Sequence, residues 1–143
     1  MILRYRLLSG GARPPERAHD DDAGFDLRAA EAARIEPGAR ESVGTGISFE
    51  LPPDHAGLVL PRSGLAARHG IALVNAPGLI DPGYRGEVRV LLLNTDRDAA
   101  FEVEAGDRIA QLLLVRYETP ELVQAETLEQ TARGAGGFGS TGR

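Results

Sequence analysis

The chain contains neither cysteine nor lysine, and both absences exclude kinds of chemistry. Without cysteine there is no disulfide framework, no thiolate metal site and no cysteine nucleophile. All 16 basic residues are arginine. A Walker-type phosphate lysine, a Schiff base and a lysine general base are therefore excluded as well.

Long apolar runs are also missing. No segment approaches the roughly 18–20 apolar residues that a membrane-spanning helix needs. Arg4 interrupts the N-terminal apolar segment too early for the apolar region of a secretory signal. We therefore expect a cytoplasmic protein that contacts no membrane.

Positive charge is in the minority, with 16 basic against 21 acidic residues and a formal net charge of −5. This balance argues against a nucleic-acid partner, because duplex binding needs an extended basic surface. A site for phosphate must instead be a local cluster of positive groups, helped by a metal ion.

The 143 residues favour one domain, and 18 glycines with 9 prolines disfavour a helical bundle. Short apolar or alternating segments between turn residues predict many short strands. The strands are expected at 2–8, 25–30, 40–51, 57–60, 71–74, 87–94 and 108–117. The fold class is thus all-β, a jelly-roll-like β-sandwich or barrel of short strands.

One short helix is expected at 63–70, with Ser63 as its N-cap and Gly70 at its end. The apolar runs at 87–94 and 108–117 suit strands buried on both faces, in a sandwich core or an oligomer interface. We place the folded core at residues 1–132. Residues 133–143 form a glycine-rich tail with too little apolar content to fold alone.

The tail contains Gly134, Gly136 and Gly139 at the spacing G-x-G-x-x-G. A dinucleotide site is rejected, because that motif needs a strand before it and a helix after it. A flap whose bare backbone approaches phosphates fits better. Phe138 is an isolated aromatic suited to stacking on a base. A plain disordered terminus is the competing interpretation, which composition alone favours.

Several other residues have both a functional and an ordinary interpretation. Arg62, Ser63 and Gly64 follow a predicted strand and suit an anion site, or a helix cap beside a solvated arginine. Asp81 suits a general base or ordinary turn chemistry. Gln111 and Asp26 lie in predicted strands. Gln111 could face a ligand or bond to neighbouring backbone, and Asp26 could face a ligand or water. The acidic run 20–22 is read as a solvated loop, and no histidine receives a role.

Five segments in order resemble the trimeric dUTPase family, and together they span almost the whole chain. They are AGFDLRA (23–29), PRSGLA (61–66), NAPGLIDPGYRGEV (75–88), AGDRIAQL (105–112) and RGAGGFGSTG (133–142). The resemblance implies a jelly-roll homotrimer that hydrolyses dUTP to dUMP and pyrophosphate. Its implied role is to keep uracil out of DNA and to supply dUMP for dTMP synthesis.

The resemblance also implies roles for single residues. Asp81 would activate the water that attacks the α-phosphorus, Tyr84 would exclude a 2′-hydroxyl, and Asn75 would read the uracil edge. The α- and β-phosphates would be held by Arg62, Ser63, Gly64 and Gln111. Asp26 would order waters around Mg²⁺ or orient a nearby arginine, and Arg108 would support its own segment.

In the tail, Phe138 would stack on uracil beside Gly139, and the β- and γ-phosphates would be held by Arg133, Ser140 and Thr141. The Mg²⁺ ion would be bound mainly by phosphate oxygens and water, so no direct protein ligand is expected. Each site would be shared between subunits and closed by a tail.

Two alternatives remain from the sequence. A dCTP deaminase, or a bifunctional relative of the same fold, would need a catalytic glutamate, and Glu87 is the one glutamate close to the central segment. The local run Y-R-G-E matches the diphosphatase better. A non-enzymatic regulator that kept the fold is disfavoured by the presence of all five segments.

Overall fold

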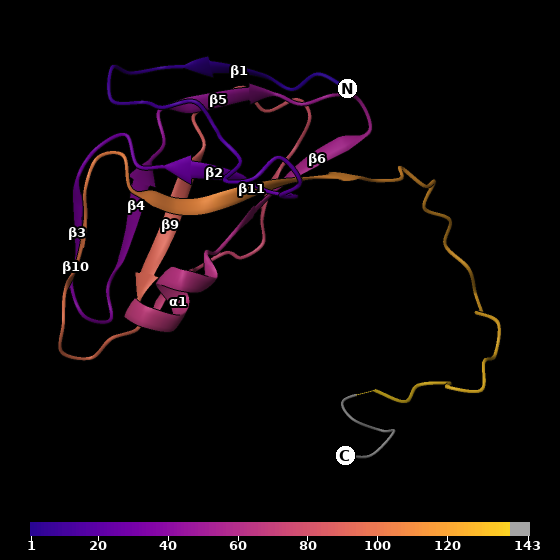
Figure 1. Cartoon of the computed structure of the whole chain (residues 1–143). Coiled ribbons are helices and arrows are strands. Elements are labelled where there is room, and N and C mark those ends of the chain that lie inside the picture. The colour runs from indigo at the N-terminus through magenta and orange to yellow at the C-terminus, as the bar shows by residue number, and fades with distance from the viewer. Residues whose placement is uncertain (138–143) are drawn as a thin grey trace.

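The computed structural model describes residues 1–137, which form eleven strands and one short helix. Most of the ordered elements are therefore β-strands, as expected (Figure 1). In chain order the elements are β1 (Arg4–Leu7), β2 (Phe25–Arg28), β3 (Ala33–Ile35), β4 (Arg40–Gly44), β5 (Ile47–Glu50), β6 (His55–Leu60), α1 (Ser63–His69), β7 (Ile71–Leu73), β8 (Gly78–Ile80), β9 (Arg89–Asn94), β10 (Phe101–Val103) and β11 (Arg108–Arg116).

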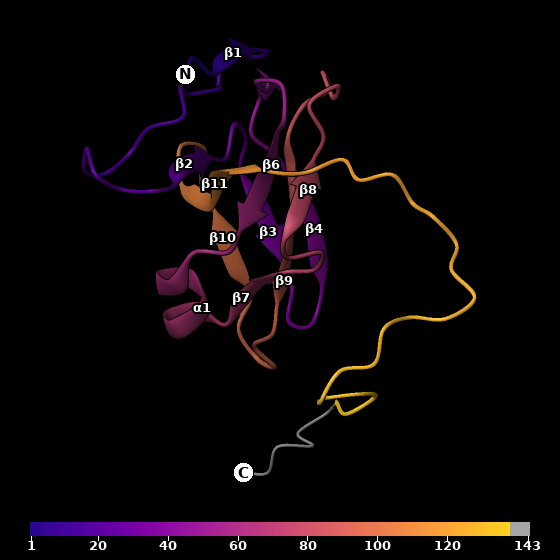
Figure 2. The same cartoon turned by 90° about the vertical axis from the view of Figure 1, so that its right-hand side faces the viewer.

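The strands form four small antiparallel sheets. The largest has the order β2-β11-β6-β8, and the next has the order β4-β9-β7. Two-stranded sheets pair β1 with β5 and β10 with β3. Figure 2 shows β6 and β8 side by side, with α1 near the end of β7.

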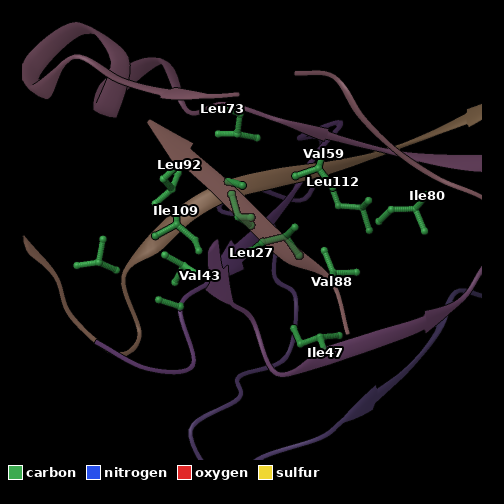
Figure 3. Close-up of a cluster of buried hydrophobic side chains, with 14 of the residues drawn as sticks. Leu27, Val43, Ile47, Val59, Leu73, Ile80, Val88, Leu92, Ile109 and Leu112 are labelled. Atoms are coloured by element: carbon green, nitrogen blue, oxygen red, sulfur yellow. The ribbon is translucent and has the colours of Figure 1, made fainter. Parts of the chain in front are cut away.

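All four sheets contribute to one hydrophobic core. Figure 3 shows side chains from several of these strands meeting there, among them Leu27 of β2, Val43 of β4 and Leu112 of β11. These three residues are at most 1% exposed. Burial of such aliphatic side chains is worth about 1.5–3 kcal/mol each, so this shared core fixes the sheets against one another.

The sequence predicted the larger elements correctly. Strands expected at 25–30, 57–60 and 108–117 are β2, β6 and β11, and the helix expected at 63–70 is α1. The end of α1 is also confirmed, because Gly70 adopts a left-handed φ of 62° and its N–H donates to the carbonyl of Ala66.

Other local predictions were wrong. The strand expected at 40–51 is split into β4 and β5 by Thr45 and Gly46, where Gly46 takes a φ of 64°. Arg62, not Ser63, is the N-cap of α1, and no side chain caps the helix. Strands β3, β8 and β10 were not predicted.

The apolar runs at 87–94 and 108–117 were expected to be buried on both faces. Within one chain this holds only in part. Along β9 the side chains alternate, with Leu92 fully buried and Leu91 37% exposed. The outward face of this strand therefore carries the accessible apolar side chain of Leu91 beside the charged Arg89.

After β11 the chain leaves the body. Residues 118–137 form no helix or strand, and Figures 1 and 2 show them running well away from the sheets. Leu122 and Leu128 on this arm are 93% and 86% exposed. Within residues 1–137, no helix combines the length and the apolar character that crossing a bilayer requires.

Candidate active site

Three charged side chains meet where β2, β11 and the start of α1 come together. Asp26 lies opposite Gln111 in the β2–β11 ladder. Its Oδ1 is 3.2 Å from Nε of Arg62, and its Oδ2 is 3.2 Å from Nη1 of Arg108. The Asp26 side chain is only 14% exposed, so both arginines are held by a carboxylate that is largely removed from water.

Beside this cluster lies a polar hollow of about 300 Å³. Gln111 points into it and donates from Nε2 to the carbonyl of Pro61, at 3.0 Å. A Cβ at Gly24 would lie 3.2 Å from Oε1 of Gln111, so glycine leaves this amide room. The hollow is lined by Ala18, Asp22, Ala23, Gly24, Asp26, Arg62, Ser63, Gly64 and Gln111.

This arrangement brings together five residues that the sequence predicted, namely Asp26, Arg62, Ser63, Gly64 and Gln111. Arg108 joins them through Asp26 and through its own carbonyl, which accepts a hydrogen bond from Nη1 of Arg62 at 3.2 Å. The guanidinium groups and the amide are suited to binding phosphate oxygens.

A second hollow, of about 340 Å³, lies along the hairpin between β7 and β9. Asn75, Asp81 and Tyr84 line it, together with apolar residues that include Leu73 and Val90. An apolar wall with a few polar groups is typical of a site for a small organic ligand. Within residues 1–137 the Asp81 carboxylate takes part in no ion pair, so it is available to a ligand or water.

Tyr84 is fixed by the turn that carries it. Its N–H donates to the carbonyl of Asp81 at 3.1 Å, and its hydroxyl donates to the carbonyl of Glu87 at 2.9 Å. A Cβ at Gly86 would lie only 2.4 Å from the Tyr84 hydroxyl oxygen. Glycine at position 86 therefore allows the phenol to fold back over the chain.

Asp81 and Arg62, which line different hollows, are far apart in one copy of the chain. In the β6–β8 ladder Ile80 lies opposite Gly57 and Gly78 lies opposite Val59. Asp81 thus continues beyond one end of the pair, while Arg62 follows the other end of β6. At about 3.3 Å per residue the separation along the strands is roughly 20 Å. A single copy does not bring Asp81 to the hollow that contains Arg62.

Sequence reasoning missed the side chains that support the Tyr84 turn. Glu87 was considered only as a deaminase residue, and Arg89 was not considered. The structure joins them, with 2.9 Å between Nη1 of Arg89 and Oε2 of Glu87. The run G-T-G at 44–46 was the available signal for this contact, because the N–H of Gly46 binds the Glu87 carboxylate.

The predicted tail residues divide into two groups. Arg133 lies in a turn of the arm, where its Nε donates to the carbonyl of Gly136 at 3.0 Å. It lines neither hollow. Phe138, Gly139, Ser140 and Thr141 lie outside the described residues, so their predicted contacts stay predictions.

The donors at the first hollow fit a magnesium ion that is bound mostly through water and phosphate. Mg²⁺ commonly keeps several waters and takes one or two carboxylates with substrate phosphates. Asp22 and Asp26 supply carboxylates here, although Asp26 already binds two arginines. Within the described part of the chain, no three acidic or histidine side chains cluster as a ready metal site.

Comparison with known proteins gives consistent matches. The family model for dUTPase matches residues 12–142. The deoxyuridine 5′-triphosphate nucleotidohydrolase of Tropheryma whipplei (strain Twist) is 50% identical over 141 residues, which is 99% of this chain and 97% of that protein. The protein of the same name from Solibacter usitatus (strain Ellin6076) is 54% identical over 149 residues, with 100% of both chains covered.

Solved structures agree with these sequence matches. The dUTPase of Staphylococcus bacteriophage 80alpha with dUpNHpp superimposes with a TM-score of 0.93 at 32% identity, covering 99% of each chain. A dUTPase of phage phi11 of S. aureus, described with a structural Mg(II) ion, gives a TM-score of 0.85 at 30% identity. It covers 91% of this chain and 100% of that chain.

Proposed function

The chain belongs to the dUTPase family, and we propose that it hydrolyses dUTP to dUMP and pyrophosphate. One observation carries the proposal. The two hollows are lined by the segments that resemble the family, one rich in phosphate-binding groups and the other carrying a free carboxylate beside a fixed phenol. These are the parts that hydrolysis of a nucleoside triphosphate needs.

In this proposal Asp81 is the general base. Its carboxylate takes a proton from a water molecule as that water attacks the α-phosphorus, and pyrophosphate leaves. Tyr84 packs against the deoxyribose, and its ring leaves no space for a 2′-hydroxyl. Asn75, on the same hairpin, reads the uracil edge together with nearby backbone groups.

The phosphates bind at the first hollow. Arg62, Ser63, Gly64 and Gln111 hold the α- and β-phosphates, while Asp26 keeps the Arg62 guanidinium in place. A magnesium ion would neutralise the phosphate charge, and Asp22 and Asp26 would hold its water ligands. The net charge of −5 makes such local neutralisation necessary for an anionic substrate.

We propose a jelly-roll homotrimer in which each site is completed by more than one copy. The separation of roughly 20 Å between Asp81 and Arg62 supports this, because a general base must act within hydrogen-bond reach or through one water. The exposed Leu91 of β9 and the exposed leucines of the arm, Leu122 and Leu128, also offer apolar surface for a second copy. Residues 133–143 then close the site, with Phe138 on the uracil and Arg133, Ser140 and Thr141 on the outer phosphates. Action in the cytoplasm remains a prediction.

The experiment that tests this function is a panel of the four common deoxynucleoside triphosphates, dUTP and UTP, with Mg²⁺ and detection of pyrophosphate. We expect pyrophosphate from dUTP and little from the others. Ammonia released from dCTP would instead identify a deaminase. The structure argues against that outcome, because both oxygens of Glu87 are already bound, one by the N–H of Gly46 and one by Arg89. No release from any nucleotide would favour a non-enzymatic regulator.

A further inference from the structure

Glu87 joins the turn that carries Tyr84 to the corner between β4 and β5. Its Oε1 accepts a hydrogen bond from the N–H of Gly46 at 2.8 Å. Its main-chain carbonyl accepts the bond from the Tyr84 hydroxyl at 2.9 Å. One residue therefore holds the phenol on one side and the body of the protein on the other.

The corner itself is rigid and leaves little space. Thr45 is fully buried, and its hydroxyl donates to the carbonyl of Val88 at 2.6 Å. The N–H of Val88 donates in turn to the carbonyl of Ile47 at 2.8 Å. The N–H of Val88 belongs to the same peptide unit as the Glu87 carbonyl, so this backbone bond helps to orient that carbonyl. The Glu87 carboxylate is a further contact that holds position 87 to the corner.

A second contact holds the carboxylate from the other side. Arg89 pairs with Oε2 of Glu87 at 2.9 Å, and its Nη2 donates to the carbonyl of Ser42 on β4 at 2.6 Å. A Cβ at Gly44 would lie 2.6 Å from Oε1 of Glu87 and 2.9 Å from Nη1 of Arg89. A side chain at position 44 would therefore displace the ends of this pair from their present positions.

We propose that the Glu87 carboxylate is a positioning residue that sets the discrimination between deoxyribonucleotides and ribonucleotides. It does so by fixing the carbonyl on which the Tyr84 hydroxyl is anchored. This inference rests on the proposed function, because it assigns the phenol to the sugar of the substrate. Glu87 also lines the second hollow, but in this proposal it acts on the sugar through the Tyr84 hydroxyl and takes no part in the proton transfer.

The physical reason lies in how a steric filter works. A ring rejects a 2′-hydroxyl only when it cannot move aside, because a small displacement relieves the clash. Binding of the deoxyribose itself depends less on the exact ring position. Loss of the Glu87 contacts should therefore raise the relative use of UTP more than it lowers the use of dUTP.

The test compares kcat/KM for dUTP and UTP in wild type, Glu87→Gln and Glu87→Ala. The glutamine keeps an oxygen for the N–H of Gly46 but loses the charge that pairs with Arg89, whereas alanine loses both contacts. We expect the preference for dUTP to fall by about threefold to tenfold in Glu87→Ala, and by less in Glu87→Gln. Glu50→Gln is the control, because Glu50 also pairs with an arginine, Arg4, in a different sheet. It should keep the wild-type preference.

A second comparison separates positioning from general stability. Tyr84→Phe removes the hydroxyl through which Glu87 acts, so adding Glu87→Gln to it should change the preference no further. Arg89→Gln provides another route if Glu87→Ala does not fold, since it loosens the carboxylate without changing Glu87. An unchanged preference in these variants, with both activities reduced equally, would overturn the inference. Wild-type protein that hydrolyses no dUTP would instead refute the proposed function.

Discussion

Asp26 and Arg62 form an ion pair, with 3.2 Å between Oδ1 and Nε, although one lies on β2 and the other follows β6. The two strands are not neighbours, because β11 lies between them in the sheet. The pair therefore spans β11 at the edge of the first hollow. It presets a guanidinium where phosphate is expected to bind, before substrate arrives.

Replacing this carboxylate should weaken both stability and phosphate binding. Asp26→Asn keeps the size but leaves Arg62 and Arg108 without their shared charge. Because the Asp26 side chain is 14% exposed, we expect a loss of about 1–2 kcal/mol in the free energy of unfolding. Urea unfolding measures this, and KM for dUTP should rise in parallel. A variant with unchanged KM would show that Asp26 has no part in preparing the phosphate site.

Asp81→Asn should remove the proposed base and preserve the shape of the turn. Proton transfer of this kind contributes about 10²–10⁴-fold, so kcat should fall by that factor. Binding of a non-hydrolysable dUTP analogue, measured by calorimetry, should stay near the wild-type value. Full activity in this variant would rule out the assigned role.

Mixed assemblies test whether each site is completed by two copies. Arg62→Ala and Asp81→Asn should each be nearly inactive alone. When the two chains are co-refolded in equal amounts, random assembly predicts about a quarter of the sites with both intact residues. Activity of the mixture should therefore recover toward that fraction. A mixture as inactive as its components would place both residues of a working site on one copy.

Deleting residues 133–143 should abolish most turnover without unfolding the protein. The buried hydrophobic residues of the described chain lie between Leu27 and Leu112, so the deletion removes no core contact. The thermal midpoint should stay unchanged while kcat with dUTP falls. Phe138→Ala serves as the finer variant, with an expected weakening of substrate binding by about 1–3 kcal/mol. A truncated chain with normal turnover would contradict the closing role.

Acid stability should depend on Asp96. The N–H groups of Asp98 and Ala99 hydrogen-bond its carboxylate and lower its pKa from the usual 3.8. A lowered native pKa means that the stabilisation is complete above the unfolded pKa and is lost as pH falls through the native one. Wild type should therefore exceed Asp96→Asn in stability near neutral pH, and the difference should shrink below about pH 4. Unfolding curves at several pH values measure this difference, and a constant gap would be the contrary result.

The larger elements could be predicted because their signals are local. Apolar runs at β9 and β11 and the glycine after α1 carry the information in neighbouring residues. Strands β3 and β10 are three residues each and form through pairing with one another. Their partners are distant in the sequence, so no local pattern indicates them.

The candidate site was predictable in its residue types and not in its geometry. Asp26, Arg62 and Gln111 were singled out, and the structure does bring them together. The opposite placement of Asp81 follows from the register of β6 with β8, which depends on tertiary packing. The supporting role of Glu87 likewise depends on its hydrogen bond from Gly46, a residue 41 positions earlier in the chain.

The distance between Asp81 and Arg62 also has a consequence for how the molecule responds to dilution. If neither residue can complete a working centre alone, a dissociated copy contributes nothing to turnover. Activity per milligram should then fall sharply below the concentration at which the copies separate. An enzyme that was active as a single copy would keep the same activity per milligram on dilution. A low concentration of the chain would by itself keep the enzyme inactive, without an inhibitor.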